Sequence, residues 1–179
     1  DAKEVSSGVL SEKKSIEIKE YINKQLAERK SVDLKGMYGK NLRGLKLTGA
    51  NLAGSDLSGI DLSGAELARV DFSGANFDGI LLTGATIQES DFSGVKFKKF
   101  NAPGVDFQAS IFNGTTFEDV NFSNANFEEA DFTSAKISNS RFDEANMVKA
   151  IMKEVEMDNV NLQKANLVNV NLSGSKINN

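Results

Sequence analysis

From residue 40 onward, large apolar side chains recur at every fifth position of the chain. Every fifth residue from Leu42 to Ile177 gives 28 positions, and all are Leu, Phe, Ile or Met except Ala102. The residue two before each is mostly small or β-branched, and the residue between them is Asn or Asp in 16 of the 28 cases. Because helices repeat apolar positions about every 3.6 residues and strands every second residue, this pattern fits neither. It predicts a chain that makes a short extended step and then turns, repeatedly.

Glycines mark the turns of this repeat. All 13 glycines after residue 36 lie two positions after the central apolar residue, from Gly39 to Gly174. A type II turn needs positive φ at its third residue, which glycine adopts without steric cost. From about Asp119 onward this position is mostly Asn, Glu, Ser or Lys. We therefore expect the turn type to change partway along the stack.

The spacing of charges indicates how many steps close one coil. Stacked coils would place residues one coil apart at roughly 4.8 Å, where opposite charges attract. Between residues 40 and 179, an offset of 20 gives nine opposite pairs and one like pair, whereas offsets of 15 and 25 give mostly like pairs. Four pentapeptides therefore make one coil, and residues 40–179 make about seven coils. The nine pairs are Lys46 with Glu66, Arg69 with Glu89, Asp78 with Lys98, Lys98 with Glu118, Lys99 with Asp119, Glu129 with Lys149, Lys136 with Glu156, Glu144 with Lys164, and Glu156 with Lys176.

Residues 1–39 form an N-terminal segment of a different kind. A stretch at about residues 11–29 has the pattern of an amphipathic helix, with Ile18, Ile22 and Leu26 on one face and Tyr21 beside them. The end of a solenoid exposes apolar side chains and unpaired strand edges. We therefore expect this helix to cap the first coil, and a helix that docks a partner is the alternative.

Composition excludes several kinds of chemistry. The chain has no His, Cys or Trp, but 12 Phe and 15 Gly, and 11 of the Phe take central positions. Without His and Cys there is no Ser-His-Asp or Cys-His nucleophile and no thiolate or imidazole metal site. We expect no enzymatic activity, no cofactor and no metal. The net charge of -4 is too small to indicate a nucleic-acid or anionic-membrane partner.

The chain also contains no apolar run long enough to span a membrane. It begins at Asp1, which we interpret as the loss of a native N-terminal segment. A soluble protein is the expectation. The cytoplasm is favoured as its compartment, and an organelle lumen or secretion are the alternatives.

The repeat resembles the pentapeptide repeat family, whose signature is A(D/N)LXX. Matching segments are Ala50-Asn51-Leu52, Ala75-Asn76-Phe77, Ala125-Asn126-Phe127 and Ala165-Asn166-Leu167. The resemblance covers residues 40–179 and implies an all-β solenoid, a right-handed quadrilateral β-helix. Family members include rigid adaptors, lumenal proteins, secreted effectors, and DNA mimics that bind type II topoisomerases.

Outward apolar residues are the candidate contact sites, because outward positions should otherwise be polar. Val148, Ile151 and Val168 are expected to lie together at one corner of the last two coils, with Ile111 farther along the column of Ile151. Leu81 stands alone.

Charged groups give weaker candidates. The basic run from Lys96 to Lys99 is expected to be neutralised by acidic residues in neighbouring coils. The like-charged pair Asp71 and Asp91 has the spacing of a cation site, but a solvated pair is the favoured interpretation.

The C-terminal coil shows no capping segment. Leu162, Leu167, Leu172 and Ile177 are expected to form an open apolar face. Native residues could follow it, or two copies could form a homodimer through it, as is familiar in this family.

Together these features predict a non-enzymatic rigid scaffold that binds an unidentified protein. The alternative is a DNA-mimicking regulator of DNA gyrase, although outward columns that alternate in sign copy phosphate spacing poorly.

Overall fold

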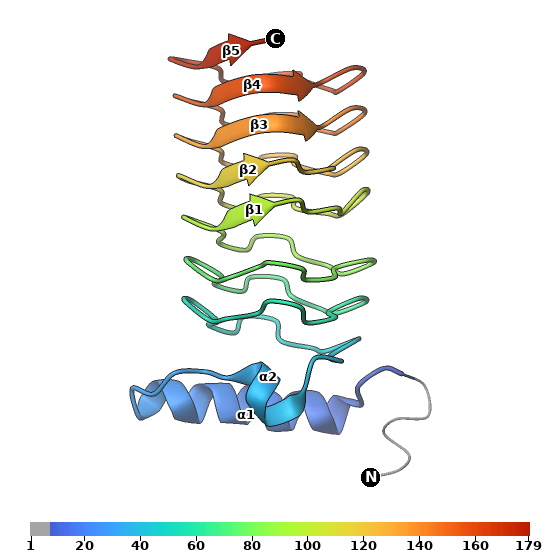
Figure 1. The fold of residues 1–179 in the computed structure, drawn as a ribbon, viewed down its shortest axis with the longest axis vertical. Helices are drawn as coiled ribbons and strands as arrows, with labels where there is room; N and C mark the ends of the chain where they lie inside the picture. The colour runs from blue at the N-terminus through green and yellow to red at the C-terminus, as the bar shows by residue number, and fades with distance from the viewer. Residues whose placement is uncertain (1–7) are drawn as a thin grey trace.

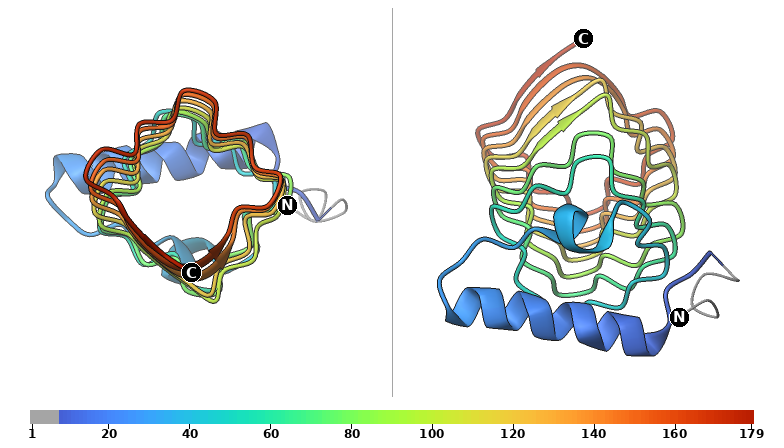
Figure 2. Two further views of the ribbon diagram at one scale, coloured as in Figure 1. Left: turned by 90° about the horizontal axis from the view of Figure 1, so that it is seen from above. Right: turned by 60° about the horizontal axis from the view of Figure 1, so that its bottom comes forward.

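The computed structural model describes residues 8–179 as a parallel β-solenoid that stands on an N-terminal helix (Figure 1). Residues 1–7 of the N-terminal segment lie outside the described residues. Seen along the axis, the coils superimpose on one four-cornered outline, and the helix crosses below them (Figure 2). The predicted fold class is therefore confirmed.

Backbone pairing joins residues that are 20 positions apart. Parallel bridges run from Asn41 with Asp61 to Ile151 with Asn171. On one face the pairing forms a five-stranded parallel sheet in the order β1-β2-β3-β4-β5. Its strands are β1 (Lys96–Lys98), β2 (Thr116–Glu118), β3 (Lys136–Arg141), β4 (Glu156–Asn161) and β5 (Lys176–Asn178). This register confirms four pentapeptides per coil.

The expected count of about seven coils includes the two end coils. Among residues 8–179, the first and last coils are each bonded to only one neighbouring coil. Only the inner coils therefore have a bonded coil on each side, and these are fewer than seven.

The Asn or Asp before each central residue closes the step of the chain. The Ser73 N–H donates to Asp71 Oδ1 at 2.9 Å, and the Glu128 N–H donates to Asn126 Oδ1 at 3.1 Å. The central residue then closes the turn, since the Ala75 N–H donates to the Phe72 carbonyl at 2.9 Å. A short side-chain acceptor that bonds the backbone two residues on is the reason for Asn and Asp at this position.

The left-handed backbone at the turn persists where glycine is replaced. Gly84 has φ 69°, and Glu129 and Asn139 have φ 57° and 50°. The turn does change, but along one face rather than from one point in the chain. On that face the chain already bends without a hydrogen-bonded turn at Lys99, one coil before Asp119, and β3 and β4 then run as six-residue strands.

The core is a column of stacked side chains along the axis. Phe112 lies between Phe92 and Phe132, with ring centroids 5.1 and 5.0 Å apart and planes inclined by 6° and 15°. Phe100 and Ala102, which exchange the usual small and large positions, are both buried. Close packing of this kind makes the rod stiff across its width.

Buried hydroxyls tie neighbouring coils together. Ser90 Oγ donates to the Leu67 carbonyl at 2.8 Å and accepts the Val70 N–H at 3.1 Å. Ser110 repeats this bridge one coil further on. Within residues 8–179, no buried side-chain nitrogen or oxygen lacks a hydrogen-bond partner.

Two helices close the N-terminal end. α1 (Glu12–Ala27) is capped by Ser11, whose side chain accepts the Lys14 N–H, and α2 (Leu34–Tyr38) follows it. Ile18 and Ile22 are fully buried against the first coil, Tyr21 is half-buried, and Leu26 is exposed at the edge. No helix among the described residues is long and apolar enough to cross a membrane.

Candidate protein-contact surfaces

Three of the outward apolar residues lie at one corner of the last two coils. Val148 and Val168 stand on adjacent coils, where the Lys149 N–H donates to the Val168 carbonyl at 2.9 Å. Val168 is 57% exposed, Val148 is half-buried, and Ile151 is exposed around the corner. We call Val148, Ile151 and Val168 the corner patch.

Ile111 is separated from the corner patch by a carboxylate. Asp131 pairs with Ile111 on one side and with Ile151 on the other. The structure therefore places Ile111 two coils away, with a charged residue between it and the patch.

The corner patch continues onto the C-terminal end of the rod. Leu167, Leu172 and Ile177 are exposed there and Leu162 is half-buried, whereas Met157 is covered one coil below. Leu167 directly precedes Val168 in the chain. The expected homodimer through this end stays a prediction.

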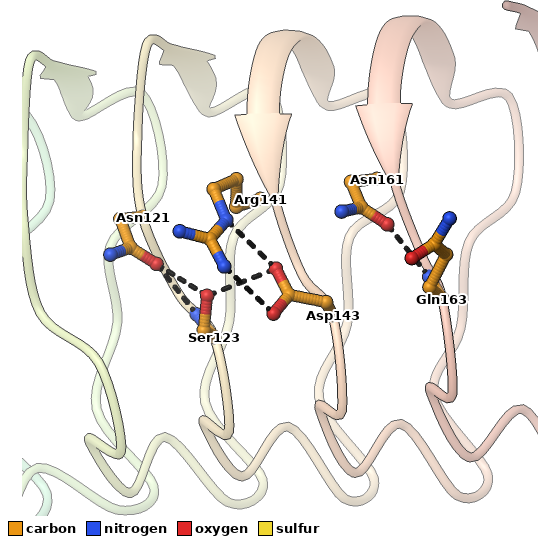
Figure 3. Close-up of polar contacts among 6 residues, drawn as sticks. All are labelled: Asn121, Ser123, Arg141, Asp143, Asn161 and Gln163. Atoms are coloured by element: carbon orange, nitrogen blue, oxygen red, sulfur yellow. Dashed lines mark hydrogen bonds and ion pairs between the residues drawn. The ribbon is translucent and has the colours of Figure 1, made fainter.

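A polar cluster on the neighbouring face is not apparent from the sequence pattern (Figure 3). Arg141 donates from Nε and Nη2 to the two carboxylate oxygens of Asp143, both at 3.0 Å. The single proton of the Ser123 hydroxyl has two acceptors within reach, Asn121 Oδ1 at 2.6 Å and Asp143 Oδ1 at 3.0 Å. The Arg141 guanidinium lowers the pKa of the Asp143 carboxyl, and Asp143 raises the pKa of Arg141.

This cluster could have been found only by comparing coils. Arg141 replaces the Asn that stands at residues 101, 121 and 161 of the same column. The exception is visible in the sequence, but its pairing within one pentapeptide is not. The ion pair joins Arg141 and Asp143, which are two positions apart, so the 20-residue register between coils does not predict it.

The predicted charge pairs have the correct 20-residue register, but few of them are close enough to form ion pairs. Among the described residues, three of the nine pairs lie within 4.0 Å: Lys46 with Glu66, Lys98 with Glu118, and Glu129 with Lys149. All three pairs are exposed, where side-chain entropy and screening leave little net attraction. The Lys98 contact leaves the basic run from Lys96 partly neutralised.

The Asp71 and Asp91 carboxylates are engaged by serines. Asp71 accepts the Ser73 hydroxyl at 2.6 Å, and Asp91 accepts the Ser93 N–H at 2.8 Å. Within residues 8–179, no group of three or more carboxylates is arranged to hold a metal ion. These contacts make the pair part of the repeat's turn geometry.

Leu81 lines a surface hollow together with a residue from outside the repeat. Val9, which precedes α1, lines the same surface hollow of about 480 Å³, and both side chains are exposed. An Arg43 and Asp61 ion pair of 3.3 Å forms part of its wall.

Comparisons with known proteins agree with this architecture. A family model for pentapeptide repeats matches eight copies, in residues 37–64, 65–101, 104–139 and 135–174. A search of curated proteins found no match.

Several solved structures match parts of this chain. HetL, from the cyanobacterium Nostoc sp. Strain PCC 7120, involved in heterocyst differentiation regulation, is 20% identical over 75% of this chain and 66% of its own, with a TM-score of 0.39. This chain thus spans slightly less than two thirds of HetL. Full-length QnrB1, a plasmid-mediated fluoroquinolone resistance protein, is 22% identical over 76% of this chain and 86% of its own, with a TM-score of 0.40. A pentapeptide repeat protein of the Arabidopsis thaliana thylakoid lumen is 27% identical over 57% of this chain and 68% of its own, with a TM-score of 0.32.

Proposed function

Because this chain belongs to the pentapeptide repeat family, we propose that it is a non-enzymatic rigid scaffold that binds another protein. One observation carries the proposal: exposed apolar side chains gather at the corner patch and the adjoining end, on a rod whose other outward positions are mostly polar. Contiguous apolar surface on a soluble protein is typical of a protein contact.

Rigidity supports the proposed role. The backbone of each inner coil is bonded to both neighbours, and stacked rings fill the interior. Binding to such a surface costs little conformational entropy because the surface is already ordered, so more of the contact energy appears as affinity.

The outward chemistry favours protein binding over catalysis. His and Cys are absent from the chain, and the carboxylates of Asp71 and Asp91 are held by turn serines. Histidine is the side chain that most often serves as a general base, and the sequence contains none.

The alternative of a DNA mimic is less well supported. Along the column of Lys136 the sign alternates, with Glu156 and then Lys176 as register partners. Duplex DNA presents negative charge without alternation. We expect excess protein to leave DNA supercoiling by gyrase unchanged, and inhibition of supercoiling would favour the alternative.

The proposed function is tested by a paired substitution in the corner patch. We expect Val148→Asp with Ile151→Asp to remove specific partners that the wild-type protein retains in affinity capture from its native cells, because buried unpaired carboxylates oppose binding. Leu81→Asp, which adds the same charge at an exposed residue far from the patch, is the control. Identical partner sets for the wild type and the corner-patch variant would contradict the proposal.

A further inference from the structure

Backbone hydrogen bonding between coils lapses at a boundary near the middle of the rod. At an intact boundary the amide of a central residue donates to a carbonyl of the next coil, as the Phe72 N–H does to the Asp91 carbonyl at 2.8 Å. Within residues 8–179, the Phe77 and Leu82 amides have no such acceptor, and no parallel bridge joins residues 76–84 to residues 96–103. We call this boundary the seam. It lies directly below β1, which is why the sheet begins there (Figure 1).

The sequence omits the groups that would close the backbone step on each side of the seam. One coil earlier in the same column, the Ser63 N–H donates to Asp61 Oδ1 at 2.9 Å. Leu81, at the next such position, has no side-chain acceptor. Asn101 has the acceptor, but the residue two positions on is Pro103, which has no N–H to donate. Neither edge of the seam can therefore form this hydrogen bond.

The core packing changes at the same boundary. The rings of Phe97 and Phe117 are nearly parallel, inclined by 3°, whereas those of Phe77 and Phe97 are inclined by 47° across the seam. Phe100 takes an inward position that usually holds a small residue, and its ring meets that of Phe97 edge-on, with centroids 5.2 Å apart. A large side chain at such a position displaces its neighbours. Parallel ring stacking and backbone pairing are therefore lost together.

The other two faces of the same coils stay bonded. Before the seam, the Gly74 N–H donates to the Ser93 carbonyl at 3.0 Å. After it, the Glu89 N–H donates to the Gln108 carbonyl at 2.8 Å. A boundary that is bonded on two adjoining faces and unbonded on the other two can pivot about its bonded side.

Side chains do not hold the seam closed in place of the backbone. Asp78 and Lys98 face each other across it in the 20-residue register, but the ammonium of Lys98 pairs with Glu118 on the far side, at 3.6 Å. A surface hollow of about 290 Å³ opens at the start of the seam, and its lining includes Asn76, Asp78 and Lys96. The outer surface is therefore already parted at this place.

We infer that the seam is a hinge built into the rod, which opens on two faces while the other two stay bonded. Its opening changes the angle between the coils that carry α1 and the coils that carry the corner patch. Such an opening needs less free energy than global unfolding, because few hydrogen bonds and little core surface are lost. The inference goes beyond the proposed function, since it concerns how the rod bends and not what it binds.

Single cysteines in the full chain test the hinge, because the natural sequence contains none. Leu82 and Leu62 are both buried, in one column, but only the Leu62 amide is bonded to the next coil, through the Leu81 carbonyl at 2.8 Å. We expect a thiol reagent to label Leu82→Cys roughly tenfold faster than Leu62→Cys, as suits the loss of one or two hydrogen bonds. Low urea should accelerate labelling of Leu62→Cys but scarcely that of Leu82→Cys. Equal rates, or equal urea dependence, would overturn the inference.

A repair of the seam gives the matched variant. Leu81→Asn with Pro103→Ser supplies the missing acceptor and the missing N–H, so it should slow the labelling of Leu82→Cys toward the rate of Leu62→Cys. Leu81→Ala supplies neither group and should leave the labelling rate unchanged. A repaired seam that is labelled as fast as before would contradict the inference.

Hydrogen exchange distinguishes a hinge from a complete separation of the coils. The Phe72 amide, bonded on the closed side, should exchange only by global unfolding, whereas the Leu82 amide should exchange much faster. If both amides exchanged at the same rate, the boundary would open on all faces and the hinge would be wrong. None of these results alters the corner-patch experiment, so the two proposals fail separately.

Discussion

At the scale of single residues, each position of the pentapeptide has one physical task. A large side chain fills the core, and the preceding Asn or Asp accepts a backbone N–H, as Asp71 does from Ser73. The left-handed turn residue is most often glycine, but Glu129 and Asn139 adopt the same conformation. A non-glycine residue there carries roughly 1–2 kcal/mol of strain, which the surrounding coil contacts must offset.

One residue pair gives the cap a measurable pH dependence. The Lys35 ammonium donates a hydrogen bond to the Asp56 carboxylate at 2.7 Å. This bond, together with hydrogen bonds from Ser58, lowers the pKa of Asp56 from 3.8 to about 2. Because the folded-state pKa lies below the unfolded value, the contact stabilises the fold above about pH 4 and is lost as the pH falls toward 2.

We therefore expect Lys35→Met to raise the Asp56 pKa toward 3.8 in a carbon-13 NMR titration of the carboxyl groups. Lys19→Met is the control, since Lys19 donates to the Thr48 carbonyl instead. An unchanged Asp56 midpoint in Lys35→Met would show that another group causes the shift.

At the scale of elements, the two ends of the rod differ. α1 covers the first coil through Ile18 and Ile22, and its Ser15 hydroxyl accepts the Lys46 N–H at 3.0 Å. The last coil exposes Leu172 and Ile177 and half of one edge of β4. Because solenoid coils contact only their neighbours, the cap acts mainly on the coils beside it.

The cap prediction compares two isoleucines of one helix. We expect Ile18→Ala to lower the free energy of unfolding by roughly 2–5 kcal/mol, because Ile18 is fully buried and its truncation leaves a cavity. Ile16→Ala should change it by at most about 0.5 kcal/mol, since Ile16 is 60% exposed. Urea unfolding measures both variants, and similar losses would mean that α1 does not pack as described.

At the scale of the whole molecule, stability is distributed along one continuous core. The stacked rings from Phe72 to Phe132 pass through the middle of the rod, and bridges of constant register surround them. Each coil is bonded only to the coils beside it, so local damage should spread coil by coil.

Phe112 provides the test of this view. We expect Phe112→Ala to cost roughly 3–5 kcal/mol of stability, because the ring is fully buried between two others. Hydrogen exchange should then accelerate most in the adjoining coils and least at α1. Leu81→Ala, at a side chain that is 54% exposed, is the control. Uniform acceleration along the rod would instead indicate a single cooperative unit.

Some features of the candidate surfaces follow from the repeat pattern, and others depend on how the coils are arranged. The repeat pattern predicts which residues point outward, so Val148, Ile151 and Val168 could be named from it. It does not predict that Asp131 isolates Ile111, or that Val9 and Leu81 line one surface hollow. Those outcomes depend on which columns adjoin and on where the segment before α1 lies.

The sequence by itself determined the period, the inward residues and the 20-residue register, because a large side chain every fifth residue and alternating charges admit one way of stacking. Only the tertiary structure decided which face becomes the sheet and where its turns open, as at Lys99 and across Asn139. It also decided that Arg141 pairs with Asp143 within one coil rather than with a neighbouring coil. Exposed side chains have several partners of similar energy within reach, so their contacts depend on the packed arrangement around them.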